Sequence, residues 1–136
     1  NPYRQKVEDS IKKFVFEGYQ VIHLSIHSFT PNYFGQEREV EIGLLFDPQR
    51  ACESHFCEDW LNYLKGNSKL DVRYNQPYQG IDDGFTTYLR TQFSNEEYLG
   101  IELEVSQKII PQRSIHKILE ESLLAISSFP HTRLVN

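Results

Sequence analysis

The chain has 136 residues, of which 39% are hydrophobic, so it has the size of one ordinary domain and enough apolar residues for a core. Its net charge of −5 argues against a general nucleic-acid binder, and no apolar run approaches the roughly 20 residues that cross a bilayer. No signal-peptide pattern opens the sequence, and Cys52 and Cys57 are too few and wrongly spaced for a zinc knuckle, so we expect reduced thiols in a cytoplasmic protein.

The first two predicted elements are a helix over residues 3–17 and a strand over residues 20–27. Within the strand, apolar residues alternate with His23, Ser25 and His27, which makes one face apolar and the other polar. The Ser-Phe-Thr-Pro sequence that follows ends the strand, because proline lacks the backbone donor that a sheet requires.

His27 therefore stands at the carboxyl end of its strand, where ligands bind in open α/β sheets. From the strand alone, a ligand-binding histidine and a core histidine bonded to a carbonyl are about equally supported. Four residues of strand span about 13 Å, so one ion at about 2 Å from each ligand cannot bridge His23 and His27. We expect His27 to be the functional residue of the two and His23 to be structural.

The remaining predicted elements alternate between strands and helices. The loop after the first strand, at 29–38, is a place where gating or specificity can lie. The elements that follow are a strand at 39–46, a helix from Asp47-Pro48 to about Leu64, a strand at 70–74, a short helix at 85–93, a strand at 98–105, a helix from about Ser114, and a loose tail from Pro130.

This alternation predicts an α/β fold, a mostly parallel sheet with helices on both faces in three layers. The first strand arrives with no strand before it to pair with, which fits the latter part of a larger domain better than a complete small one. We therefore expect residues 1–136 to form a single α/β domain or the C-terminal portion of one. In the second case some sheet surface is uncovered, and self-association through it is expected.

The strand at 98–105 carries Glu102 and Glu104 on one face. A carboxylate on a central strand is costly unless it is paired or bound to a cation. An edge strand with a solvated face is one explanation, and a general base beside a metal is the other. Glu104 lies nearer the carboxyl end and is favoured as the base, whereas Glu102 would orient it or hold an arginine.

A third group of polar residues lies around the helix at 85–93. Thr86 and Thr87 are candidates to cap this helix and to donate to an anion there. Arg90 has the planar fork that clamps a carboxylate with two parallel hydrogen bonds, although surface arginines without such a role are common.

Five runs together resemble the N-formylglutamate amidohydrolase family, which is more distantly similar to zinc carboxypeptidases and aspartoacylases. Their order and spacing match over roughly residues 2–107, and the combination is specific. The runs are His-Leu-Ser-Ile-His-Ser-Phe-Thr-Pro, Glu-Ile-Gly-Leu-Leu-Phe-Asp-Pro, Arg-Tyr-Asn-Gln-Pro-Tyr, Asp-Gly-Phe-Thr-Thr-Tyr-Leu-Arg and Gly-Ile-Glu-Leu-Glu-Val-Ser-Gln.

The resemblance implies a zinc-dependent hydrolase of an N-acyl, formyl-type amino acid. By position, His27 would be a zinc ligand and Glu104 the glutamate base, with Glu102 as the alternative register. The matching runs also imply that the substrate-binding residues are Arg73, Asn75, Tyr78 and Arg90.

One feature of such enzymes is missing from the sequence. They take a His and a Glu ligand from a segment well before the His-Ser strand, and no such segment precedes His27 here. One His and one Glu fall short of the three protein ligands of catalytic zinc. The alternative function is therefore a non-catalytic binding or scaffold relative with an incomplete metal site.

Overall fold

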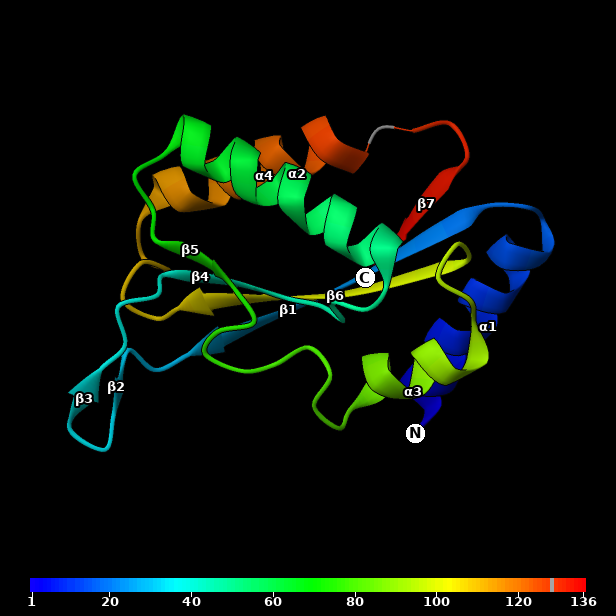
Figure 1. Ribbon diagram of the computed structural model, residues 1–136, viewed down its shortest axis with the longest axis horizontal. Coiled ribbons are helices and arrows are strands. Elements are labelled where there is room, and N and C mark those ends of the chain that lie inside the picture. Colours follow the sequence, from blue (N-terminus) through cyan, green and yellow to red (C-terminus); the bar gives the residue numbers. More distant parts are fainter. Residues whose placement is uncertain (128) are drawn as a thin grey trace.

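The computed structural model describes residues 1–127 and 129–136. Helices and strands alternate along most of the chain (Figure 1). Their order is α1 (Pro2–Phe16), β1 (Gln20–Phe29), β2 (Asn32–Tyr33), β3 (Gln36–Glu37), β4 (Ile42–Leu45), α2 (Ala51–Asn67), β5 (Val72–Tyr74), α3 (Phe85–Gln92), β6 (Tyr98–Ser106), α4 (Arg113–Ser127) and β7 (Thr132–Val135).

The centre of the fold is a five-stranded sheet with the strand order β5-β4-β6-β1-β7. The pairs β1–β6, β1–β7 and β4–β5 are parallel, and β4–β6 is antiparallel. Helices α2 and α4 cover one face, and α1 and α3 lie on the other (Figure 1). The predicted α/β class, with a mostly parallel sheet between two helical layers, is confirmed.

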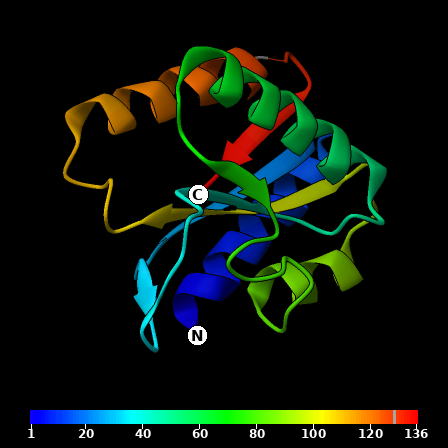
Figure 2. The ribbon, with the colours of Figure 1, turned by 60° about the vertical axis from the view of Figure 1, so that its left-hand side comes forward.

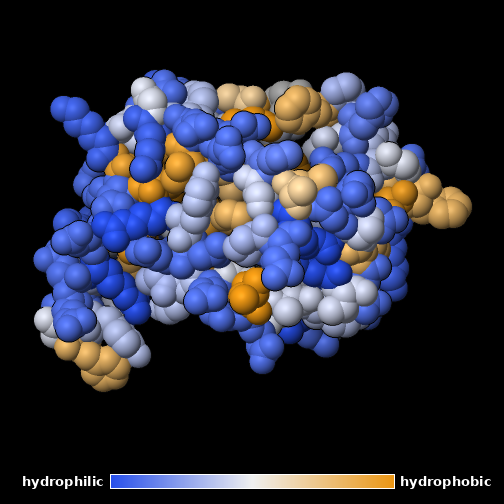
Figure 3. All heavy atoms as spheres, viewed as in Figure 1, coloured by the Kyte–Doolittle hydropathy of each residue, from blue (hydrophilic) through white to orange (hydrophobic). Residues whose placement is uncertain are grey.

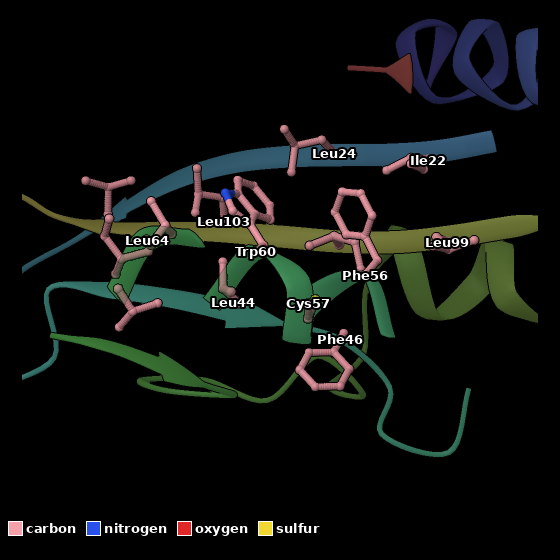
Figure 4. Close-up of a cluster of buried hydrophobic side chains, with 14 of the residues drawn as sticks. Ile22, Leu24, Leu44, Phe46, Phe56, Cys57, Trp60, Leu64, Leu99 and Leu103 are labelled. Atoms are coloured by element: carbon pink, nitrogen blue, oxygen red, sulfur yellow. The ribbon is translucent and has the colours of Figure 1, made fainter. Parts of the chain in front are cut away.

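The larger core lies between the sheet and the layer of α2 and α4. Ile22 and Leu24 of β1 point into it, as their alternation with polar residues predicted, and Trp60 of α2 is completely buried there (Figure 4). The indole Nε1 of Trp60 donates to Ser122 Oγ of α4 at 2.8 Å, which ties the two helices together. The polar face of β1 is thereby left to the opposite side of the sheet.

A smaller core lies under α1 and α3, where Val7, Ile11, Val21, Leu89 and Tyr98 are buried. His23 is also buried on this side, and its Nδ1 is hydrogen-bonded to the Tyr98 hydroxyl at 2.7 Å. The expected structural role of His23 is confirmed. This core occupies the amino-terminal part of β1 and β6, so it leaves the carboxyl ends of both strands free for a site.

Two segments differ from the sequence prediction. The tail expected to be loose from Pro130 instead forms β7, which pairs in parallel with Gln20–His23 of β1. Its Thr-Arg-Leu-Val sequence alternates as an edge strand does, and Arg133 lies with its guanidinium carbon 3.8 Å from the ring centroid of Tyr19. The loop after β1 contains the short antiparallel hairpin of β2 and β3, which projects away from the three layers (Figure 2).

The outer edge of β1 is only partly covered. β7 stops at the partner of His23, so the following residues of β1 have no strand on that side within the described chain. Ile26 in this stretch is 54% exposed. The expected self-association through such a surface stays a prediction. Among the described residues, no helix combines the length and apolar character needed to cross a membrane.

Candidate functional site

The carboxyl ends of β1 and β6 bring the three main predicted site residues together. His27 is the direct partner of Glu104, and Ser25 is the direct partner of Glu102. Since the two strands are parallel, these side chains lie at the same end of the sheet and on the same face. The prediction that His27 and Glu104 share one end of the sheet is confirmed.

The two carboxyl groups lie in unequal environments. Glu104 is 6% exposed, and its buried Oε2 has no hydrogen-bond partner among the residues that the structure describes. Burial raises the pKa of Glu104 and the neighbouring Glu102 raises it further, whereas His27 and Arg38 oppose the increase only in part. Burial also raises the pKa of Glu102, which is half-buried. Both carboxylates therefore bind a proton more strongly than an exposed glutamate does.

The floor of the site is completed by β4 and by the loop over residues 75–80. Gly43 is the cross-strand partner of Glu104 in the antiparallel pair β4–β6. A β-carbon at Gly43 would collide with the backbone carbonyl of Gln76 and would lie 3.4 Å from the β-carbon of Glu104. The absence of a side chain at this position lets the loop rest on the sheet directly beside the buried carboxylate.

Asn75 holds this loop in place. Its backbone has a φ of +51°, a conformation that asparagine tolerates better than most residues. Its side-chain Oδ1 accepts hydrogen bonds from the backbone amides of Phe46 at 3.1 Å and Gly80 at 2.9 Å. Oδ1 of Asn75 thus supports the loop, and the expected contact of Asn75 with a substrate stays a prediction.

Arg73 and Arg90 also have protein partners. Arg73 donates to both carboxylate oxygens of Asp71, at 2.7 and 2.8 Å, on the edge strand β5. The Nε of Arg90 donates to Glu53 at 3.0 Å, and its two terminal nitrogens donate to the carbonyls of Gly80 and Gly100 at 2.8 Å each. Every nitrogen of Arg90 thus has an acceptor, which favours a structural role over the substrate contact expected from the sequence.

The threonines at the start of α3 do not cap it. The N-cap is Gly84, which offers no side-chain hydrogen bond, and the helix begins at Phe85. Thr86 is buried, and Thr87 Oγ1 donates to the carbonyl of Asp82 at 2.6 Å. The predicted capping role of Thr86 and Thr87 is wrong, because the helix already begins at Phe85 and both threonines lie within its first turn.

Tyr78 lies beside the site and contacts Arg38, a residue that no sequence pattern indicated. Its hydroxyl accepts a hydrogen bond from Nη1 of Arg38 at 3.4 Å. Arg38 directly follows the hairpin β2–β3, at the end of the loop in which specificity was expected. Its position beside the site depends on the folding of that loop, and the sequence carries no pattern that separates it from other loop arginines.

The donor types at the strand ends are those that zinc takes. An imidazole and carboxylate oxygens are ordinary zinc ligands, and the unpartnered Oε2 of Glu104 is a free acceptor next to His27. No three His, Cys, Asp or Glu side chains form a metal-binding group within the described residues. The chain as described thus offers one imidazole and a neighbouring base, and a full set of ligands needs further donors.

A cavity of about 600 Å³ opens on the opposite face of the sheet, between β1 and α4. Its lining is mainly apolar, with Leu24, Ile26, Leu103 and Leu119 among the lining residues. Glu102 and Glu104 do not line it, because they project from the other face of β6. His27, at the strand end, borders this cavity, whereas Glu102 and Glu104 place the candidate site at the open end of the sheet on the side of α1 and α3.

Comparisons with known proteins agree with this geometry. The sequence model of the N-formylglutamate amidohydrolase family matches residues 1–110. A gene product from Agrobacterium tumefaciens of known crystal structure is similar in fold, with a TM-score of 0.68 and 31% identity over 92% of this chain. The match covers 50% of that protein, so the chain spans about half its length. No curated protein matches significantly. The chain therefore belongs to the N-formylglutamate amidohydrolase family.

Proposed function

We propose that this chain carries the base and one metal ligand of a zinc-dependent amidohydrolase that cleaves N-acyl, formyl-type amino acids. The observation that supports this most directly is the pairing of His27 with Glu104, whose Oε2 is buried and has no partner in the described part of the chain. An unpaired buried carboxylate is costly for stability, and proteins keep such groups at sites where they act.

The roles of the residues follow from their positions. His27 would hold zinc, which when bound supplies Lewis-acid activation of water and of the amide carbonyl. Glu104 accepts the proton of the attacking water and later delivers it to the leaving amine. Its raised pKa suits both steps, because a stronger base takes the proton more readily and still releases it to an amine. Glu102, one strand repeat deeper, keeps Glu104 oriented toward the open end.

One observation favours the alternative, a non-catalytic relative that binds a ligand or serves as a scaffold. No group of three metal-binding side chains exists in the described residues. Catalytic zinc is normally held by three protein ligands. A chain that retains the sheet and the two carboxylates without that set would bind zinc weakly and hydrolyse nothing.

Metal content and formate release distinguish the two functions. Zinc would be titrated into the purified chain and measured by elemental analysis, and formate release from N-formyl-L-glutamate would be followed in parallel. The hydrolase requires zinc that is lost in His27→Ala and kept in His55→Ala, a change at an exposed histidine on α2. Zinc binding that is equal in both variants would remove His27 as a ligand and favour the scaffold.

A further inference from the structure

The guanidinium group of Arg38 lies among three aromatic rings. Its central carbon is 4.6 Å from the ring centroid of Tyr33, 5.3 Å from that of Tyr78 and 5.8 Å from that of Phe29. These distances lie within the range of favourable cation–π contacts. The three rings come from the hairpin, from the loop after β5 and from the end of β1, so Arg38 lies where three separate segments meet.

Only one of the three nitrogens of Arg38 is engaged. Nη1 donates to the Thr30 carbonyl at 3.3 Å and to the Tyr78 hydroxyl at 3.4 Å. Nε and Nη2 have no acceptor within residues 1–127 and 129–136, and no carboxylate there forms an ion pair with this arginine. An arginine whose orientation is fixed on one side and free on the other can bind a carboxylate through two parallel hydrogen bonds.

The position of Arg38 links it to the candidate site. Phe29, beneath the guanidinium, lies on β1 two residues beyond His27, which puts both side chains on the same face. Tyr78, on the other side, belongs to the loop that rests on Gly43, the partner of Glu104. Arg38 is thus held at the rim of the open sheet end, about one strand repeat beyond the paired His27 and Glu104.

We propose that Arg38 binds the carboxylate of the ligand at this site and selects N-acyl amino acids over neutral amides. This inference rests on the proposed function for the identity of the ligand. The charge balance supports it, because Glu102 and Glu104 repel an anion from the site unless a cation compensates. Arg73 and Arg90 are already paired with Asp71 and Glu53, which leaves Arg38 to supply that charge.

The hairpin of β2 and β3 forms a solvent-exposed side of this site next to Arg38. β2 and β3 project from the body of the protein, and apolar atoms gather at their tip (Figure 3). Phe34 is 89% exposed there, and the ring centroids of Tyr33 and Phe34 are 4.4 Å apart. Arg38 therefore lies between an aromatic hairpin and the polar strand ends, as expected for a ligand that carries carboxylate and amide groups.

The test compares binding of N-formyl-L-glutamate with binding of the analogue in which both carboxylates are primary amides. Calorimetry or NMR titration of the purified chain would give both dissociation constants. Wild type is expected to prefer the acid by at least about tenfold, the value of one good charge-assisted contact. Arg38→Gln is expected to abolish the preference, and Arg38→Lys to retain part of it, because lysine keeps the charge and loses the fork.

Arg133→Gln is the matched control, since Arg133 also stacks on a tyrosine but lies at the other end of β1. It should bind like wild type. Melting curves would establish that each variant is folded. If Arg38→Gln is not folded, the comparison of Arg38→Lys with wild type decides the outcome. A preference that survives in Arg38→Gln, or that is missing from wild type, overturns the inference.

Formate release separates this inference from the proposed function. Hydrolysis with an unchanged KM in the Arg38 variants overturns the role of Arg38 and leaves the amidohydrolase intact. Acid binding that depends on Arg38, with zinc binding that is equal in His27→Ala and His55→Ala, supports the role of Arg38 and overturns the proposed metal site.

Discussion

His27 and Glu104 are direct neighbours across the parallel strands β1 and β6. Adjacent strands lie about 4.8 Å apart, so the imidazole and the carboxylate can act on one small group at the strand ends. The position of Glu104 lowers the stability of the fold, since its Oε2 is buried without a hydrogen bond among the described residues. Replacing Glu104 should therefore change both the rate of hydrolysis and the stability of the fold.

The first prediction concerns the identity of the base. Glu104→Gln should lower the rate of formate release by about 10²–10⁴-fold, the usual cost of losing a general base, without lowering zinc content. Glu102→Gln should have the smaller effect, because Glu102 lies one strand repeat farther from the open end. Initial rates and elemental analysis of both variants check this. If Glu102→Gln is inactive and Glu104→Gln is active, then Glu102 is the base, one strand repeat deeper than proposed.

The same variant should also change stability. A raised pKa means that the folded state binds protons more tightly than the unfolded state, so the carboxylate lowers stability at neutral pH and this cost fades as the pH falls. Glu104→Gln should therefore melt at a higher temperature than wild type at pH 7. The two proteins should converge in acid, where Glu104 is protonated.

The second prediction concerns Gly43. Alanine at this position brings its β-carbon into the backbone carbonyl of Gln76, which has no flexible end that can move away. The loop over residues 75–80 must lift from the sheet, carrying Tyr78 away from Arg38, so both acid binding and stability should fall. Gly66→Ala is the control, because its β-carbon meets nothing within 4 Å on α2 and alanine favours helix. Equal melting temperatures for the two variants would contradict this account of the loop.

The shared sheet end of the site residues was predictable from the sequence. Alternation with period two fixed which residues of β1 and β6 share a face, and strands separated by helices favoured parallel pairing. Parallel strands with polar residues at their carboxyl ends place those residues at the same end of the sheet. The order of strands was not predictable, and neither was the antiparallel direction of β4 that brings Gly43 beside Glu104.

The partners of the arginines could not be predicted in the same way. Arg90 pairs with Glu53, which is 37 residues away, and the sequence offers 19 acidic residues from which to choose. Asn75 is likewise engaged by Phe46, 29 residues away. Such contacts depend on how α2, α3 and the loops pack, and local sequence patterns contain no information about that packing. The position of Arg38 beside the site could not be predicted for the same reason.

The third prediction concerns acid stability. Burial lowers the pKa of His23 from 6.5 to about 4, because the charged imidazole cannot be solvated beneath α3. Between these values the unfolded state binds the proton and the folded state does not, so stability falls as the pH drops through this window. The loss is on the order of 3 kcal/mol, at 1.36 kcal/mol per pKa unit.

Urea unfolding at pH 7 and at pH 4.5 measures this loss. His23→Gln removes the titrating group and should flatten the difference, even though it is less stable at pH 7. Glu102 and Glu104 act with the opposite sign, since their raised pKa values favour the folded state in acid. The comparison of the variant with wild type cancels that contribution. An identical pH dependence in both proteins would show that His23 is not the group responsible.

The last prediction concerns Glu53, which fixes the framework behind the site. It is fully buried and accepts hydrogen bonds from Arg90 at 3.0 Å and from the Gly100 amide at 2.9 Å. Glu53→Gln leaves the buried guanidinium of Arg90 without its counter-charge, a change that typically costs 3–5 kcal/mol. Because small domains are stable by only about 5–15 kcal/mol, a large drop in melting temperature is expected. Glu58→Gln, an exposed change on the same helix, should leave the melting temperature almost unchanged, as surface substitutions usually do.

Arg90→Gln should destabilise the chain by about as much as Glu53→Gln does. The double variant should lose less stability than the sum of the two single variants, since the two residues form one pair. If Arg90→Gln melts like wild type and only loses affinity for N-formyl-L-glutamate, then Arg90 contacts the ligand and its bond to Glu53 does not support the fold.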